Sequence, residues 1–265
     1  MKKIAAFGFV LFAMVSCDQF KYSPYQIDRN SKYKELNEKN IALINPSRTD
    51  TTRVIVLGDT QRFYKSSQDL IEKINKLPDD AVDFVVHTGD LVDFGIQKEY
   101  YGIHEVLNQM KFPYVAVVGN HDMIGNGAAI YENMYGEFDF SFIVNGNKFI
   151  YINTNSREHH FDDEHPNISW LDSELEDTAN YNQAIIISHV APHHSDFNPE
   201  LEEEYVETLE RYETTLLYIN GHHHDYYYDD VYNNGIMFLN TFSTSHEKTV
   251  LVEIWDGGFK HTIID

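Results

Sequence analysis

The sequence contains a single cysteine, Cys17, among 265 residues. One thiol cannot form an intramolecular disulfide or a zinc site of several cysteines, so both frameworks are excluded. Basic residues are scarce, with 20 Lys and Arg against 42 Asp and Glu and a formal net charge of −22. Such an acidic chain repels a phosphate backbone, which argues against binding to a long nucleic acid duplex. Aromatic residues make up 14% of the chain, which argues against low-complexity disorder.

The longest apolar run lies at the N-terminus. Two lysines precede an apolar stretch over 4–15, which is too short to span a bilayer comfortably and has the length of the apolar segment of a secretory signal. It ends at Val15-Ser16-Cys17, which resembles the lipobox of bacterial lipoproteins. The resemblance implies removal of a signal peptide over 1–16, a lipid anchor on Cys17, and an extracytoplasmic, membrane-anchored protein in the periplasm or at the cell surface. The alternative is an ordinary signal peptide or short anchor in which Cys17 has no role.

Beyond residue 52 the pattern becomes regular, with short apolar runs alternating with helical spacing. We expect strands over 54–57, 84–86, 113–118, 184–188 and 216–219, helices over 66–77, 103–110, 167–175 and 200–212, a hairpin over 140–152 and strands in the tail over 235–264. The order strand, helix, strand predicts βαβ crossovers and a largely parallel sheet. We therefore expect a signal peptide over 1–16, a polar tether over 17–52, in which residues 34–40 have some helical character, and one α/β domain over 53–265.

Polar residues follow five of the expected strands at the point where each strand ends. They are Asp59, Asp90, Asn120 with His121, His189, and His222 with His224. In open α/β sheets, ligands bind outside the carboxyl ends of the strands. Carboxylate, amide and imidazole groups together suit divalent ions such as Mn, Fe, Zn or Mg. The spacing therefore predicts one ligand-binding site built from several strand ends, with residue types that are compatible with a metal.

The motifs around these residues resemble those of the calcineurin-like metallophosphoesterase family. They are Gly58-Asp59-Thr60-Gln61, Gly89-Asp90-Leu91-Val92-Asp93, Gly119-Asn120-His121-Asp122, Ser188-His189 and Gly221-His222-His223-His224. The resemblance covers roughly residues 53–224 and implies an α/β fold, a four-layer α/β/β/α sandwich of two mixed sheets, with strands of the tail in the second sheet. It implies a metal-dependent hydrolase of small phosphate esters, either a phosphomonoesterase or a phosphodiesterase, that uses two divalent ions and a metal-bound hydroxide.

The resemblance also implies a role for each matching residue. Asp90 would bridge the two ions, Asp59 and His224 would hold the first, with Gln61 where many members have histidine, and Asn120, His189 and His222 would hold the second. His121 would face the substrate as an acid or as a donor to the phosphoryl oxygen, with Asp122 behind it fixing its orientation. His223, between two ligands, is predicted to point away from the metals.

Two departures from the family pattern leave alternatives open. Gln61 is a weaker ligand than histidine, which favours a looser first site or a surface lipoprotein that uses the same fold as a catalytically weak or inactive binding module. Phe94 stands where protein serine/threonine phosphatases usually have arginine, which disfavours that branch. No feature indicates a protein partner. Because the chain has few cations of its own, two divalent ions would supply the positive charge that a phosphate ester needs.

Overall fold

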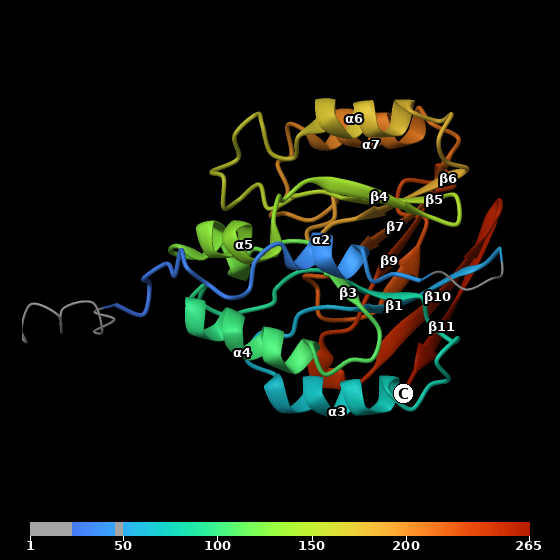
Figure 1. The fold of residues 1–265 in the computed structure, drawn as a ribbon. Coiled ribbons are helices and arrows are strands. Elements are labelled where there is room, and N and C mark those ends of the chain that lie inside the picture. Colours follow the sequence, from blue (N-terminus) through green and yellow to red (C-terminus); the bar gives the residue numbers. More distant parts are fainter. Residues whose placement is uncertain (1–22, 46–49) are drawn as a thin grey trace, which may run out of the picture.

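Short runs of β-branched residues form the strands of two sheets in the computed structural model, which describes residues 23–45 and 50–265. The first sheet has the strand order β11-β10-β1-β2-β3, and the second has the order β4-β5-β6-β7-β9-β8. Figure 1 shows the two sheets packed face to face, with α6 and α7 over one outer face and α3 and α4 over the other. This is the four-layer sandwich of two mixed sheets that the sequence predicts.

Three parallel strands and a C-terminal hairpin make up the first sheet. The strands are β1 (Thr52–Leu57), β2 (Phe84–His87), β3 (Tyr114–Ala116), β10 (Thr249–Trp255) and β11 (Gly258–Ile264). The helices α3 (Tyr64–Ile74) and α4 (Gln97–Leu107) connect β1, β2 and β3, which pair in parallel, while β10 pairs antiparallel with β1. The carboxyl ends of β1, β2 and β3 therefore lie at one edge of the sheet.

The second sheet begins with the expected hairpin. Its strands are β4 (Phe140–Val144), β5 (Asn147–Tyr151), β6 (Gln183–Ile187), β7 (Thr215–Asn220), β8 (Tyr227–Asp229) and β9 (Met237–Asn240), and the helices α6 (Ile168–Glu176) and α7 (Glu202–Glu210) cover it. The strands β5, β6, β7 and β9 run parallel. Asn167 caps α6, since its side chain accepts the N–H of Trp170 at 3.1 Å.

Three buried apolar clusters fill the three spaces between the four layers. In β1 the side chains alternate between two of them: Val54 and Val56 face the second sheet, and Ile55 faces the helices. Between the sheets, the rings of Phe84 and Phe149 meet edge to face with centroids 4.9 Å apart. Full burial of a side chain of this size contributes roughly 1.5–3 kcal/mol, so both faces of each sheet are stabilised by the core.

The tail differs from the expectation that its strands belong to the second sheet. Only β9 does so, while the hairpin of β10 and β11 extends the first sheet, because β10 pairs with β1 over five residues. A regular strand pattern in the sequence does not say which of two sheet edges the strand will join.

The segment before the domain, expected as a polar tether with some helical character over 34–40, contains a short helix that packs on the domain. Residues of this segment form α2 (Leu36–Ile41), which lies against β3 and α5 (Gly127–Tyr135). Asn37 is buried, donates from Nδ2 to the carbonyl of Ala116 at 2.9 Å and accepts the N–H of Ala116 at 3.0 Å. These bonds satisfy backbone groups at the free edge of β3 and hold the segment on the domain.

Within residues 23–45 and 50–265, no helix combines the length and the apolar character needed to cross a bilayer. The expected signal peptide over 1–16 and the cysteine at position 17 lie outside the described residues.

Candidate metal centre

The five polar motifs of the sequence meet at the carboxyl ends of β1, β2, β3, β6 and β7, which belong to both sheets. The backbone joins them directly: the N–H of Asp59 donates to the carbonyl of Gly89 at 3.0 Å, and the N–H of His222 donates to Oδ1 of Asp59 at 3.2 Å. Loops that are 163 residues apart in sequence are thus held together at one edge of the sandwich.

The loops adopt backbone conformations that are uncommon for residues with side chains. Asp59, Asp90, His222 and His224 have φ angles of 52°, 55°, 75° and 64°. Such angles cost about 1–3 kcal/mol each and cluster at functional sites. Close approach also requires glycine at position 119, because a Cβ atom there would collide with the backbone nitrogen and Oδ1 of Asp90. The local fold therefore gives up stability to bring polar side chains together.

Four potential ligand atoms converge between the two sheets. Oδ1 of Asn120 lies 3.0 Å from Nε2 of His189 and 3.0 Å from Nδ1 of His222. Nε2 of His189 lies 3.3 Å from Nδ1 of His222 and 3.3 Å from Oδ1 of Asp90. We name this the Asn120 cluster. Its one amide oxygen, two imidazole nitrogens and one carboxylate oxygen are a donor set that suits a divalent ion.

Both histidines of the Asn120 cluster have an outer partner on the opposite ring nitrogen. Nδ1 of His189 lies 2.7 Å from the carbonyl of Thr88, and Nε2 of His222 lies 3.1 Å from Oδ2 of Asp196. Each of these oxygens can accept a hydrogen bond from the ring N–H, and in a neutral ring the other nitrogen then presents its lone pair to the cluster. Metal-binding histidines almost always have such a partner.

A second group of side chains lies on the other side of Asp90, and we name it the Asp59 cluster. Nε2 of His224 lies 3.4 Å from Oδ1 of Asp59, and Oδ2 of Asp59 is buried with no hydrogen-bond partner among the described residues. A buried carboxylate oxygen without a donor is costly. A cation beside it would remove that cost, so the residues present fit a metal ion.

The side-chain amide of Gln61 contacts both Asp90 and His224. Its Nε2 donates to Oδ2 of Asp90 at 3.1 Å and lies 3.3 Å from Nε2 of His224, while its Oε1 is buried with no partner among the described residues. The amide nitrogen has no lone pair for a metal. In this orientation Gln61 ties Asp90 to the Asp59 cluster by a hydrogen bond instead of coordinating an ion.

Burial and neighbouring charges shift the acids and bases of the two clusters. Burial, together with the charge of Asp90, raises the pKa of Asp59 to about 7. Burial also acts to raise the pKa of Asp90, but His189 outweighs it and holds that pKa at about 2, while the pKa of His189 rises because Asp90 outweighs its burial. Two buried carboxylates resist ionising together, and a divalent cation between them would allow it.

His121 is held beside the clusters by Asp93. Its Nδ1 lies 2.9 Å from the backbone carbonyl of Asp93 and 3.5 Å from Oδ1 of the same residue. Asp93 is in turn paired with the guanidinium of Arg62. The ring is therefore fixed through Nδ1, and its side chain remains 31% exposed, so that Nε2 is free to meet a substrate.

Asp122 does not take the expected place behind His121. Both of its carboxylate oxygens accept backbone N–H groups, from Val92 at 3.0 Å and from Gly119 at 2.8 Å. Among the described residues no hydrogen bond or ion pair joins it to the ring of His121. Asp122 instead ties together the loops that follow β2 and β3. The sequence motif contains Asp93, but its position alone does not show which of the two aspartates faces His121.

The other histidines near the site make contacts outside the two clusters. His87 is buried in β2, its Nε2 lies 3.1 Å from Oγ1 of Thr60, and burial lowers its pKa to about 3. The ring of His223 packs edge to face against His194 at 4.7 Å and against Tyr227 at 5.7 Å between centroids. The expectation that His223 points away from the metals agrees with these contacts.

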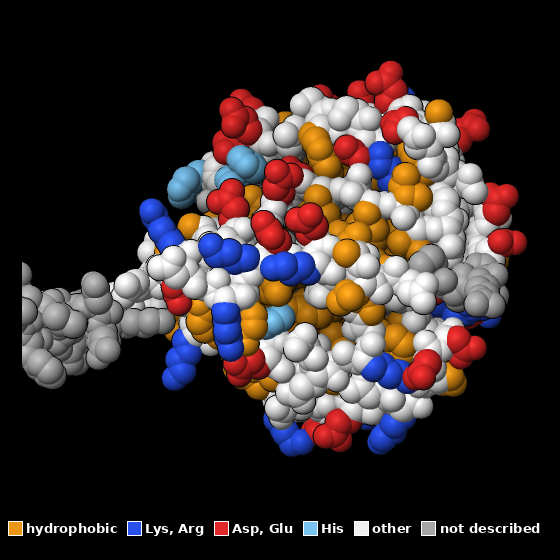
Figure 2. All heavy atoms as spheres, in the orientation of Figure 1, with side chains coloured by type: hydrophobic (Ala, Val, Ile, Leu, Met, Phe, Trp, Pro, Cys, Tyr) orange, Lys and Arg blue, Asp and Glu red, His pale blue; other side chains and the backbone are white. Residues whose placement is uncertain are grey.

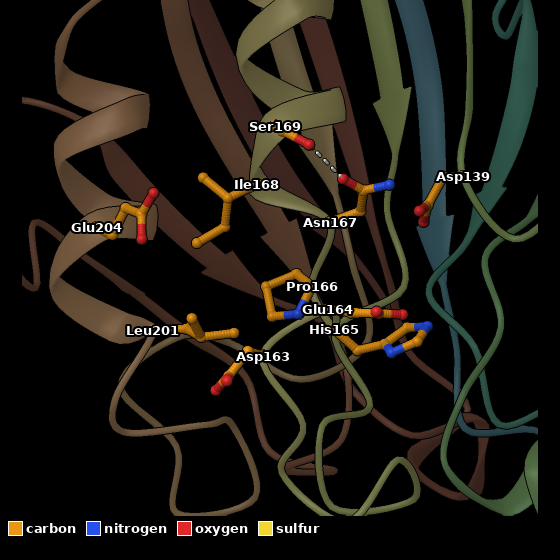
Figure 3. Close-up of a pocket in the computed structure, with 10 residues that line it drawn as sticks. All are labelled: Asp139, Asp163, Glu164, His165, Pro166, Asn167, Ile168, Ser169, Leu201 and Glu204. Carbon is orange, nitrogen blue, oxygen red and sulfur yellow. Dashed lines mark hydrogen bonds between the residues drawn. The ribbon is translucent and has the colours of Figure 1, made fainter.

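A cavity of about 460 Å³ lies elsewhere, between the loop before α6 and the start of α7 (Figure 3). Its lining includes the carboxylates of Asp139, Asp163, Glu164 and Glu204. These negatively charged side chains would repel the negative charge of a phosphate ester, so the cavity does not suit such a substrate. Among these groups, burial raises the pKa of Asp139 to about 6, although Oδ1 accepts the N–H of Asn153 at 2.7 Å.

The raised pKa of Asp139 predicts a stability that depends on pH. Because it lies above the value of about 3.9 for an unfolded aspartate, the native protein binds this proton more tightly, and stability falls as the pH rises from about 4 to 6. Asp139→Asn keeps an acceptor for Asn153. We expect it to be more stable than the wild type by about 3 kcal/mol at pH 8 and about equally stable at pH 4, as measured by urea unfolding of chelator-treated protein. An equal difference at both pH values would contradict the prediction.

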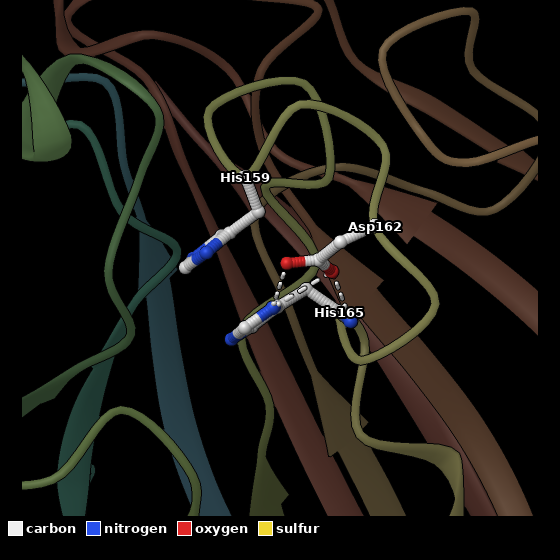
Figure 4. A group of neighbouring side chains, drawn as sticks. All are labelled: His159, Asp162 and His165. Carbon is white, nitrogen blue, oxygen red and sulfur yellow. Dashed lines mark hydrogen bonds and ion pairs between the residues drawn. The ribbon is translucent and has the colours of Figure 1, made fainter.

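His159, Asp162 and His165 form a further group on the loop before α6 (Figure 4). The two imidazole rings are stacked, with centroids 3.4 Å apart and planes within 8° of parallel. Nδ1 of His165 lies 3.0 Å from Oδ1 of Asp162, and Nε2 of His159 lies 3.1 Å from the amide nitrogen of Asn153. Lone pairs of imidazole lie in the ring plane, so stacked rings do not converge on one ion. We assign no metal to this group.

Comparison with known proteins identifies relatives of the sequence and of the fold. The family model described as calcineurin-like phosphoesterase matches residues 52–226. No curated protein matches the sequence. Among solved structures, a dimetal phosphatase from Danio rerio is similar with a TM-score of 0.65 at 13% identity, over 83% of this chain and 96% of that one.

Two further structures share the fold at a similar level. The GAP50 anchor of the inner membrane complex of Plasmodium has a TM-score of 0.59 at 16% identity, over 81% of this chain and 84% of that one. The purple acid phosphatase PPD1 of yellow lupin has a TM-score of 0.59 at 14% identity, over 82% of this chain and 52% of that one. At these identities the likeness establishes a shared fold.

Proposed function

The chain belongs to the calcineurin-like phosphoesterase family, and from that premise we propose that it is a metal-dependent hydrolase of small phosphate esters. The observation that carries the proposal is the convergence of the Asp59 and Asn120 clusters on the two oxygens of one buried residue, Asp90. Oδ1 of Asp90 faces His189 at 3.3 Å, and Oδ2 accepts from Gln61, which also contacts His224. In this proposal Asp90 would contribute one oxygen to each of two cations.

The two clusters suggest the ligands of each ion. Asp59, Asp90 and His224 would hold the first, and Asp90, Asn120, His189 and His222 the second. Two divalent ions, when bound, would neutralise the phosphoryl oxygens and make a water molecule a better nucleophile. Mn, Fe, Zn or Mg would suit these oxygen and nitrogen donors. The guanidinium of Arg62, which follows the first motif, is paired with Asp93.

His121 would handle the proton of the leaving group. The carbonyl of Asp93 holds Nδ1, so a neutral ring keeps its proton on that nitrogen, and a protonated ring presents Nε2–H outward. As the bond from phosphorus to the leaving oxygen breaks, Nε2–H can donate its proton to that oxygen.

A substrate panel tests this proposal. The chelator-stripped protein, reloaded in turn with Mn, Fe, Zn and Mg, is assayed with nitrophenyl phosphate, bis-nitrophenyl phosphate and a set of nucleotides. We expect turnover that disappears on chelation and returns with a divalent ion, and the ratio of the first two rates separates phosphomonoesterase from phosphodiesterase. Absence of turnover on every substrate with every ion would overturn the proposal.

The second candidate function is a binding module that retains the fold with weak or no catalysis. The orientation of Gln61, with its amide nitrogen toward the Asp59 cluster, favours this alternative, because that cluster then offers fewer ligands. Such a protein would bind one divalent ion or none and would show no turnover. The metal content per chain therefore separates the two candidates.

We also propose that the protein is a lipid-anchored, extracytoplasmic protein, with the lipid on Cys17. The sequence around Val15-Ser16-Cys17 supports this, and so does a group of exposed cations on the segment that follows it: Arg29, Lys32, Lys34 and Lys39. Figure 2 shows several Lys and Arg side chains on the side of the molecule from which the N-terminal segment extends, with Asp and Glu side chains among them. Such a group is attracted to anionic lipid headgroups. Metabolic labelling with a radioactive fatty acid should mark the wild type and leave Cys17→Ser unlabelled.

A further inference from the structure

The side chain of Asp196 lies behind one of the proposed metal ligands, on the side away from the metal. Its Oδ2 is 3.1 Å from Nε2 of His222, whose Nδ1 faces the Asn120 cluster. We propose that Asp196, held in turn by Arg157, is a positioning residue that fixes the ring and tautomer of His222 and thereby sets the affinity of the second ion. The inference rests on the proposed metal-dependent function and goes beyond it by assigning a role to residues outside the family motifs.

Asp196 is held at this position from several directions. Nη1 of Arg157 lies 2.8 Å from the same Oδ2 that faces His222. The backbone joins the two loops as well, because the N–H of Arg157 donates to the carbonyl of Asp196 at 3.2 Å. The N–H of Asp196 donates to Nδ1 of His194 at 3.1 Å. The carboxylate therefore has little freedom to move relative to His222.

The surroundings make this contact stronger than a pair on the surface. The side chains of His222 and Asp196 are only 13% and 15% exposed, so solvent screens the interaction less than it would at the surface. The ring of His194 closes over His222, edge to face, with centroids 4.4 Å apart. A ring rotation of His222 would break its bond to Asp196 and move Nδ1 away from the Asn120 cluster.

His194, Asp196 and His222 could themselves be taken for a third metal site, since their ligand atoms lie within 4.8 Å of one another. The guanidinium of Arg157 already supplies a positive charge at Oδ2 of Asp196. A divalent ion there would be repelled by that charge, and it would compete with the Asn120 cluster for the same imidazole. The structure therefore favours the role of an outer partner for the carboxylate.

Removing an outer partner of a metal-binding histidine typically lowers metal affinity by about 10–100-fold. We expect Asp196→Ala to lower the affinity for the second ion by this factor. The affinity for the first ion should not change, because Asp196 makes no contact with the Asp59 cluster. Asp196→Asn keeps the oxygen that accepts from His222 but loses its charge, so its loss should be smaller. Arg157→Ala should also have a smaller effect, since Arg157 acts through Asp196 and its side chain is 47% exposed.

The test is calorimetric titration of Mn²⁺ into the chelator-stripped protein, for the wild type and each variant. Asp172→Ala is the matched control, because Asp172 also pairs with an arginine, Arg211, but on α6 and away from the site. The expected result is a weakened second binding step in Asp196→Ala, partial recovery in Asp196→Asn, and two unchanged steps in Asp172→Ala. Circular dichroism verifies that each variant is folded.

Three outcomes would overturn the inference. The first is wild-type affinity for both ions in folded Asp196→Ala. The second is an equal loss of affinity for both ions in Asp196→Ala, and the third is a loss of affinity in Asp172→Ala as large as that in Asp196→Ala. Failure of the proposed function looks different: in that case the wild type itself shows no binding of Mn²⁺ or no turnover. If the wild type binds two ions and the folded Asp196 variants bind both with wild-type affinity, the proposed function stands and the positioning role falls.

Discussion

Replacing Asp90 by alanine should reduce kcat/KM by at least about 10³-fold and remove most of the bound metal. Asp90 is buried, and its two oxygens face the Asn120 cluster and the Asp59 cluster. Two metal ions stabilise the charge of the transition state by several kcal/mol, and every 1.36 kcal/mol corresponds to tenfold in rate. Loss of the residue that both ions would share should therefore affect affinity and rate together. The measurement is kcat/KM with nitrophenyl phosphate, alongside the metal content of the same sample.

Asp90→Ala also removes the carboxylate that faces His189 at 3.3 Å, and breaking a buried ion pair can destabilise a protein by about 3–5 kcal/mol. Asp90→Asn guards against misfolding, because it has the same shape and keeps an acceptor for the N–H of His121, which lies 2.9 Å away. Asp172→Ala serves again as the control and should retain full activity. Wild-type activity in folded Asp90→Asn and Asp90→Ala would remove Asp90 from the centre of the site.

Replacing His121 by alanine should lower kcat by about 10²–10⁴-fold, the usual contribution of a general acid, without changing the metal content. His121 takes part in neither cluster through its ring: its Nδ1 is bound to Asp93. The effect should depend on the leaving group. An alkyl phosphate releases an alkoxide that needs a proton, whereas nitrophenolate leaves without one, so the loss should be larger for the alkyl ester.

Comparison of the two esters decides the role of this residue. An equal loss on both would favour the other role, donation to the phosphoryl oxygen. Full activity on both would show that His121 does not take part. Asp122→Asn provides a contrast, because Asp122 accepts the N–H groups of Val92 and Gly119. This variant should lower the stability of the protein and leave the ratio of the rates on the two esters nearly unchanged.

Local patterns predicted the βαβ units and the meeting of polar residues at strand ends, whereas the four-layer sandwich followed from the resemblance to the family. Apolar β-branched runs define the strands, and polar residues directly after them lie at strand ends by geometry. The hairpin of β4 and β5 was also correct, since Asn145-Gly146 marks the turn. Local patterns do not show which sheet edge a given strand or helix will pair with. The pairing of β10 with β1, and of α2 with β3, depends on which edges remain free once the sheets have formed.

The same limit applies to the outer parts of the site. Asp196 lies in a loop seven residues after His189, with no motif to distinguish it from a solvated charge, yet the fold turns it onto His222. Asp93 and Asp122 are two acids in adjacent motifs, and only the folded loops show that Asp93 holds His121. The orientation of the Gln61 amide is likewise set by its neighbours, Asp90 and His224. Residue identity suggests which side chains could serve as ligands, whereas tertiary contacts determine which residues orient them.

Metal content per chain is the measurement that tests the central claim most directly. The wild-type protein is stripped with a chelator, reloaded with Mn²⁺, freed of excess ion and analysed for its elements, and the rate on nitrophenyl phosphate is recorded at each stage. The account predicts about two ions per chain after reloading, with activity that is absent from the stripped protein and returns in step with the second ion. A chain that binds no divalent ion, or one that is equally active before and after stripping, would contradict it.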